Sequence, residues 1–242
     1  MLKAGLSEDL STIYPVKNYK ISPSFNFDLE IIRSLYDYKI IKVHPSYSSL
    51  DAFTSNKQFD YPNVFKIDEV HYFLNVTCNN SNEQTINELL YENYFTEDNI
   101  EDAYSLWKKI ALEECLEYLL FSMNKVKFSF SPGKKTILLF NNLLDSFSVS
   151  EIYSIIYSSI NSSSRYYLEG NISKKHAANS VISRCQTIAD KILLGNWDSR
   201  HYGRLSSLPQ SPISEFFFNS ILKIGDKGFN CPPSIDILKN CF

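Results

Sequence analysis

The sequence predicts an α+β protein in which a small β-rich N-terminal part packs on a predominantly α-helical C-terminal part. Three observations support this fold class. Residues 64–77 (VFKIDEVHYFLNVT) are rich in β-branched and aromatic side chains, whereas the pattern turns helical after about residue 84. The chain has 242 residues, of which 44% are hydrophobic and 14% aromatic. Such a composition can build a core and excludes a disordered chain.

The first half is expected to hold the strands. Residues 1–24 contain two prolines and no sustained periodicity, so we expect an N-terminal arm, either held by the rest of the chain or mobile. A short helix near Leu29–Leu35 is followed by a strand at Tyr38–Val43, which His44-Pro45 ends. Residues 64–77 read as a hairpin that turns at Asp68-Glu69. We expect residues 25–242 to form a single α+β domain.

The second half is expected to be helical, with a helical subregion over about residues 148–242. A first helix is expected to run from a Thr96 cap to about Met123. Over Lys125–Phe130, Lys and Ser then alternate with Val and Phe, and this alternation predicts a strand. Ser148-x-x-Glu151 is a capping box that opens a helix to about Glu169. Further helices are expected over 173–195, over 211–225 and after Pro232-Pro233.

The charges are unevenly distributed along the chain. The net charge is -3, but residues 1–120 carry 19 acidic and 10 basic side chains, and residues 121–242 carry 8 acidic and 14 basic ones. The two halves could attract each other. Alternatively, the second half presents a basic surface that meets phosphate groups or an acidic protein. The pronounced excess of Lys over Arg is typical of A+T-rich genomes and carries no functional information.

Several classes of protein are excluded by missing signals. No apolar run approaches the roughly 20 residues that span a bilayer, and the N-terminus lacks the apolar stretch of a signal peptide. The five cysteines are widely spaced and contain no C-x-x-C pair, which indicates free thiols in a reducing compartment. No nucleotide-binding, hydrolase or metal motif is present. We therefore expect a soluble cytoplasmic protein without disulfides, cofactor or metal.

One carboxylate stands out in the first predicted long helix. Helical spacing places Glu114 among apolar residues, and burial of an unpaired carboxylate is costly. We expect a structural hydrogen bond from a Tyr hydroxyl or an Arg. An acid/base role is the functional alternative.

The candidate binding residues lie in the helix after Ser173 and in the loop that follows it. His176 falls on the polar side of that helix, near its N-terminus, where unpaired N–H groups favour a phosphate. The loop Trp197–Arg204 (WDSRHYGR) combines an aromatic ring, arginines and a histidine, as in loops that contact phosphates or proteins. The predicted binding residues are Lys174, Lys175, His176, Asn179, Arg184, Arg200 and Arg204.

These features favour a binding protein over an enzyme. The leading hypothesis is a non-enzymatic binding or adaptor subunit of a bacterial system, whose basic C-terminal helical face contacts nucleic-acid backbone or an acidic protein. We expect a protein partner or nucleic acid, and no membrane. The alternative is a phosphodiester hydrolase that uses His176, His201 or Glu114.

Overall fold

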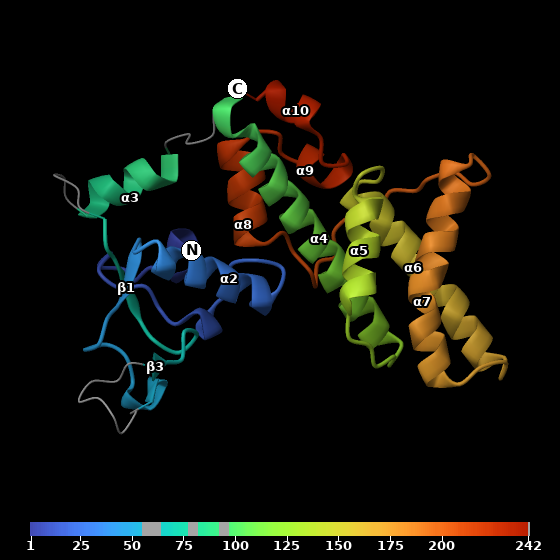
Figure 1. Cartoon of the computed structure of the whole chain (residues 1–242), viewed down its shortest axis with the longest axis horizontal. Coiled ribbons are helices and arrows are strands. Elements are labelled where there is room, and N and C mark those ends of the chain that lie inside the picture. The colour runs from blue at the N-terminus through green and yellow to red at the C-terminus, as the bar shows by residue number, and fades with distance from the viewer. Residues whose placement is uncertain (55–63, 77–81, 92–96, 242) are drawn as a thin grey trace. The chain divides into compact units, whose positions relative to one another are not determined.

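The computed structural model describes residues 1–54, 64–76, 82–91 and 97–241. Contacts within the chain group it into two compact units (Figure 1). Unit 1 comprises Met1–Tyr94 with Ser211–Phe216, and unit 2 comprises Phe95–Gln210 with Phe217–Phe242. The α+β fold class is confirmed, with antiparallel strand pairs near the N-terminus and helices dominating the second half. The expected division into an arm and one domain stays a prediction.

In its described residues, unit 1 combines short helices with two small antiparallel sheets. Its longest helix, α2, begins after Ser24, whose hydroxyl accepts a hydrogen bond from the Phe27 amide and so caps the helix. The other elements are short. The elements of unit 1 are α1 (Leu2–Gly5), α2 (Phe25–Asp37), β1 (Ile41–Val43), β2 (Phe53–Thr54), β3 (Val64–Phe65), β4 (Tyr72–Leu74), α3 (Asn82–Tyr91) and α8 (Pro212–Glu215).

The strands of unit 1 pair differently from the predicted hairpin near residues 64–77. β3 and β4 are both strands, but β4 pairs with β1 and β3 pairs with β2, each in antiparallel register. The reason is burial: Val70 and Tyr72 are fully buried with Ile13 and Ile41 in one apolar cluster. Beside β1, strand β4 lies in that cluster, and the Ile13 and Tyr72 backbones also bond to each other. Residues 1–24 thus supply part of this core.

Unit 2 is built from long helices packed side by side. Helix α6 packs against both α7 and α4, and α6 and α7 form an antiparallel pair that Figure 1 shows in ochre and orange. Helix α4 buries side chains around most of its circumference. The elements of unit 2 are α4 (Ile100–Lys125), α5 (Lys134–Leu143), α6 (Val149–Leu168), α7 (Lys174–Leu193), a π-helical segment that begins in unit 1 (Phe216–Ile221), α9 (Lys227–Asn230) and α10 (Ile235–Lys239).

Local signals placed the starts of α6 and α7 correctly. Ser148 and Glu151 form both hydrogen bonds of a capping box, and the Ser173 hydroxyl accepts the His176 amide. The predicted strand at Lys125–Phe130 is wrong: α4 continues to Lys125, and Phe128 then enters the core as part of an irregular segment. Its alternation reflects one buried ring rather than a pleated strand.

Close packing of α6 against α7 depends on small side chains. Ser159 and Ser163 on α6 are fully buried, and the Ser163 hydroxyl lies 3.0 Å from that of Ser180 on α7. Opposite them, α7 buries Ala178 and Cys185. Side chains of this size let two helix backbones approach closely, and the buried Ser163 hydroxyl remains hydrogen-bonded.

Candidate functional site

The predicted binding residues at the start of α7 are exposed. Lys174, Lys175, His176 and Asn179 all lie on the solvent side of the first two turns. Within the residues that the structure describes, their side chains form no hydrogen bond or ion pair. They are available for contacts, but they line none of the three pockets that lie near Trp197, Ile237 and Tyr14.

Arg184 is used inside the α6–α7 pair. Its Nη1 donates a 2.8 Å hydrogen bond to the Ser162 hydroxyl on α6, and its guanidinium lies 4.8 Å from the centre of the Tyr166 ring. A guanidinium held in this way ties two helices together and offers fewer donors to an external ligand. Arg184 therefore has a structural use, and its binding role stays a prediction.

Arg204 is paired with the buried carboxylate that the sequence singled out. Its Nη1 lies 2.9 Å from Glu114 Oε2, and the two side chains are 20% and 4% exposed. The guanidinium also lies 4.0 Å from the centre of the Phe229 ring. This confirms that Glu114 faces the apolar side of α4 and identifies an arginine as its partner. Burial, and next the Glu114 charge, raise the pKa of nearby Tyr153 well above its ordinary value.

The predicted residues therefore occupy separate parts of unit 2. Helix α7 has 20 residues, which at 1.5 Å per residue is about 30 Å. Lys174 lies at its start, whereas Arg200 lies beyond its end. Arg204, paired with Glu114, sits against α4 and Phe229. The structure thus leaves Arg200, in the loop after α7, as the exposed arginine of the predicted set.

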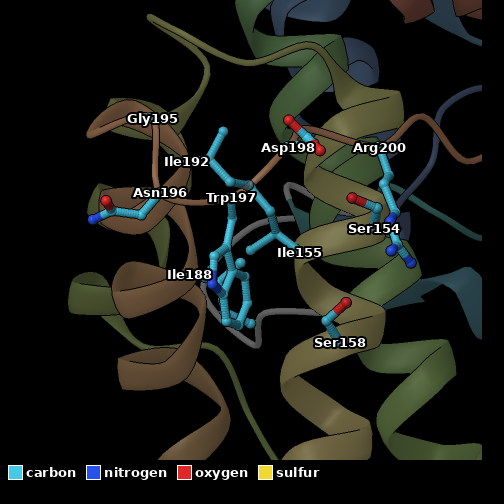
Figure 2. A pocket seen from close by; sticks show the side chains of 10 residues that line it. All are labelled: Ser154, Ile155, Ser158, Ile188, Ile192, Gly195, Asn196, Trp197, Asp198 and Arg200. Carbon is cyan, nitrogen blue, oxygen red and sulfur yellow. The ribbon is translucent and has the colours of Figure 1, made fainter.

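Arg200 lines a pocket between α6 and the end of α7 (Figure 2). The pocket has a volume of about 480 Å³. Figure 2 shows the Trp197 ring on the α7 side, beside Ile188, and the Arg200 side chain directed along α6. The lining residues are Ser154, Ile155, Ser158, Ile188, Ile192, Gly195, Asn196, Trp197, Asp198 and Arg200.

The pocket combines a flat ring, a cation and hydroxyl groups. Trp197 is 49% exposed, and the Lys191 ammonium lies 4.5 Å from the centre of its ring system. Across the described residues, the Arg200 guanidinium has no ion pair or hydrogen bond. The Ser154 hydroxyl donates to the Glu151 carbonyl at 2.9 Å, so toward a ligand it can act as an acceptor. Ser158 is exposed, and Asp198 adds one carboxylate.

The loop that carries Trp197 and Arg200 is anchored to the first turn of α6. The Ser199 hydroxyl donates a 2.6 Å hydrogen bond to Glu151 Oε1, while Glu151 Oε2 accepts the Ser148 amide of the capping box. His201 Nδ1 lies 2.8 Å from the Ser150 hydroxyl. Burial would raise the pKa of Glu151, but the hydrogen bonds from Ser199 and Ser148 outweigh it and lower that pKa. The carboxylate is thus ionised and holds the loop in place.

The three candidate catalytic residues do not lie together. His176 is near the start of α7, His201 is beside the first turn of α6, and Glu114 is buried against Arg204. Along the antiparallel helix pair, the two histidines are separated by roughly 25 Å at 1.5 Å per residue. His201 Nε2 also lies 3.9 Å from Glu151 Oε1. Over the part of the chain described, no group of three His, Cys, Asp or Glu side chains could hold a metal ion.

Sequence reasoning identified part of this pocket. It singled out the loop Trp197–Arg204 for its arginines and its aromatic ring, but it missed Ser154 and Ser158 on α6. Their i, i+4 spacing places both hydroxyls on one helix face, which was the available signal. The sequence did not show that this face meets the end of α7.

The cysteines and helices bear on two further expectations. Cys115, Cys185, Cys231 and Cys241 are free, and Cys78 lies outside the described residues. None of the helices in the described ranges combines the length and apolar character that crossing a bilayer requires.

No known protein family, curated protein or solved structure matches this chain.

Proposed function

We propose that this protein is a non-enzymatic binding module that holds single-stranded nucleic acid, with one nucleotide in the pocket between α6 and α7. The base stacks on Trp197, and the adjacent phosphate pairs with Arg200. One observation carries this proposal: the half-exposed indole of Trp197 lines the same pocket as Arg200, whose guanidinium makes no ion pair or hydrogen bond with the described residues. Base stacking on an aromatic ring together with cationic phosphate contact is the general mode of single-strand binding.

The other groups in the pocket fit a nucleotide. A volume of about 480 Å³ lies within the range of small-molecule sites, about 300–1,000 Å³. Ser158 can donate to a phosphate oxygen, and Asp198 can accept from a base amino group or a ribose hydroxyl. Ile155 and Ile188 supply apolar surface to the pocket wall.

An acidic protein surface is the competing partner. A partner carboxylate would pair with Arg200 but would leave the Trp197 ring without a flat group to stack on. Unit 2 carries 16 basic and 14 acidic residues, so its net charge alone attracts either partner only weakly. The indole therefore favours nucleic acid.

The experiment is a fluorescence-anisotropy titration of a labelled single-stranded oligonucleotide with the full chain, at several salt concentrations. Trp197→Ala removes the stacking platform, and loss of one base stack weakens binding by about 1–3 kcal/mol. Arg200→Gln removes one phosphate contact, which reduces the slope of log K against log salt by about 0.7. A duplex of the same sequence should bind more weakly, because its bases are already stacked.

Lys174→Gln is the matched control for charge, because it removes one exposed cation about 30 Å away along α7. We expect it to change affinity much less than Arg200→Gln. Equal losses from the two variants would indicate diffuse attraction rather than a pocket. If no oligonucleotide binds at low ionic strength, nucleic acid is rejected and the acidic protein partner remains.

A phosphodiester hydrolase remains the alternative. His201 favours it most, because this histidine follows Arg200 directly in the chain and contacts the Ser150 hydroxyl. Incubation of the labelled oligonucleotide with the parent chain and with His201→Ala tests it, with His176→Ala and Glu114→Ala in parallel. Absence of cleavage by the parent, or cleavage by all three variants that is unchanged from the parent, removes this alternative.

A further inference from the structure

Unit 1 contains a second pocket whose chemistry is opposite to that of the first. It has a volume of about 310 Å³, and its lining includes the rings of Tyr14, Tyr47 and His71 and the carboxylates of Glu8 and Asp9. Unit 1 as a whole carries 13 acidic and 8 basic residues. A net negative charge raises the local concentration of cations around it.

A hydrogen-bonded loop holds the two carboxylates at this pocket. The Ser7 amide donates to the Thr12 carbonyl at 2.8 Å, and the Thr12 amide donates back to the Ser7 hydroxyl at 2.9 Å. Between them, Leu10 adopts a φ of 59°, a conformation that non-glycine residues rarely take. The surrounding hydrogen bonds maintain this strain, so the loop geometry is fixed before any ligand arrives.

The two carboxylates differ in how they are used. Hydrogen bonds from Ser7 and Ser11 lower the pKa of Asp9, which keeps that group ionised at neutral pH. Glu8 is exposed, and within the described chain its carboxylate has no hydrogen-bond or ion-pair partner. The rim of the pocket therefore carries two negative charges, one of them unsatisfied.

The aromatic side of the pocket is also fixed in position. The Ser48 hydroxyl accepts the His71 amide at 2.9 Å and donates to the His44 carbonyl at 2.8 Å, which ties the segment carrying Tyr47 to β4. Tyr14 contacts the His71 ring edge-to-face with ring centres 5.9 Å apart, and Tyr47 is 6.5 Å from it. Tyr14 and Tyr47 remain 45% and 59% exposed.

The histidine in this wall is uncharged near neutral pH. Burial first, and then the proximity of His44, lower the pKa of His71. Its buried Nδ1 has no hydrogen-bond partner among the described residues, so no acceptor there stabilises the protonated ring. A neutral ring does not repel a cation.

We infer that this pocket binds an organic ammonium cation, either a free small molecule or the alkylated ammonium of a lysine side chain. Aromatic faces attract such cations, and the carboxylates of Glu8 and Asp9 complement the charge. A metal ion is a poorer fit, because the described residues contain no group of three His, Cys, Asp or Glu side chains that could hold one, and the Asp9 carboxylate already accepts three hydrogen bonds. An anion would be repelled by the rim.

The test is a ligand-observed NMR titration of the full chain with choline and with its uncharged tert-butyl analogue. We expect choline to bind and the analogue, of equal size, to bind at least several-fold more weakly. Tyr47→Leu removes an aromatic face and should weaken choline binding about two- to fivefold. Tyr47→Phe keeps the face and should restore it. Glu8→Gln should weaken binding to a similar extent.

Tyr38→Leu is the control, because Tyr38 is 80% exposed in the same unit and does not line the pocket. A peptide with one trimethylated lysine distinguishes the two sources of the cation, since tighter binding of the peptide identifies a chain-borne ligand. Equal binding of choline and its neutral analogue would overturn the inference. So would an affinity that neither Tyr47→Leu nor Glu8→Gln changes.

Discussion

Removal of Arg204 should destabilise unit 2 far more than removal of any exposed arginine. Its guanidinium lies 2.9 Å from the Glu114 carboxylate, whose side chain is only 4% exposed. Arg204→Ala leaves that carboxylate buried beside apolar residues, and breaking a buried pair from one side costs about 3–5 kcal/mol. Arg204 is itself 20% exposed, so water can reach the vacated site and we expect the lower end, about 3 kcal/mol.

The double replacement Glu114→Met/Arg204→Met distinguishes the loss of the attraction to Arg204 from the cost of keeping the Glu114 carboxylate buried without it. Apolar residues of similar size often substitute for a buried ion pair at little cost. We expect the double variant to be more stable than Arg204→Ala and within about 1 kcal/mol of the parent chain. Arg165→Ala is the matched control, because Arg165 pairs with Glu169 at the surface, where its side chain is 80% exposed. It should leave stability essentially unchanged.

Tryptophan fluorescence during urea unfolding measures these effects in unit 2 alone. The chain has two tryptophans, and both Trp107 and Trp197 belong to unit 2. With a urea dependence of about 2 kcal/mol per molar, a loss of 3 kcal/mol shifts the midpoint by about 1.5 M. A midpoint shift below about 0.3 M for Arg204→Ala would refute the reasoning, because the Glu114–Arg204 pair would then be accessible to water rather than buried.

Three further predictions concern residues of unit 2. Burial opposes ionisation of Glu151, but the Ser199 hydrogen bond helps to lower its pKa below the ordinary 4.5. Ser199→Ala should therefore cost about 1 kcal/mol at pH 7, and this difference should vanish in urea unfolding as pH falls through the folded pKa. Burial raises the pKa of Cys185 to about 12 and that of Cys115 well above its ordinary value, so both should resist a thiol reagent at pH 8 until urea is added. Ser163→Leu should cost about 1–3 kcal/mol in urea unfolding, because it overfills the α6–α7 contact. An unchanged urea midpoint would show that the helices can move apart to accommodate the larger side chain.

Helix boundaries were predictable where the signal is local. The box of Ser148 and Glu151 and the cap at Ser173 use hydrogen bonds that span three residues, so a short stretch of sequence contains both partners. The orientation of Glu114 was also predictable, since helical periodicity places it among apolar neighbours on α4.

Strand pairing and the pocket were not predictable in the same way. Residues 64–77 carry strand propensity, but propensity does not specify a partner, and burial of Tyr72 beside Ile13 selected β1 instead of a hairpin. Likewise, the alternation around Phe128 came from one buried ring. Only the assembled core decides which of several apolar patterns in the sequence becomes buried.

The sequence by itself determined the α+β class, the capped starts of α6 and α7 and the burial of one carboxylate, because these depend on residues within one or two helical turns. The tertiary structure decided that Arg204 neutralises Glu114, that Trp197 and Arg200 share a pocket with α6, and that Tyr14 and Tyr47 share one with Glu8. These contacts join segments far apart in the chain, as the separation of 51 positions between Ser150 and His201 illustrates. Their formation depends on which apolar surfaces pack together, and that packing cannot be predicted from any short stretch of sequence.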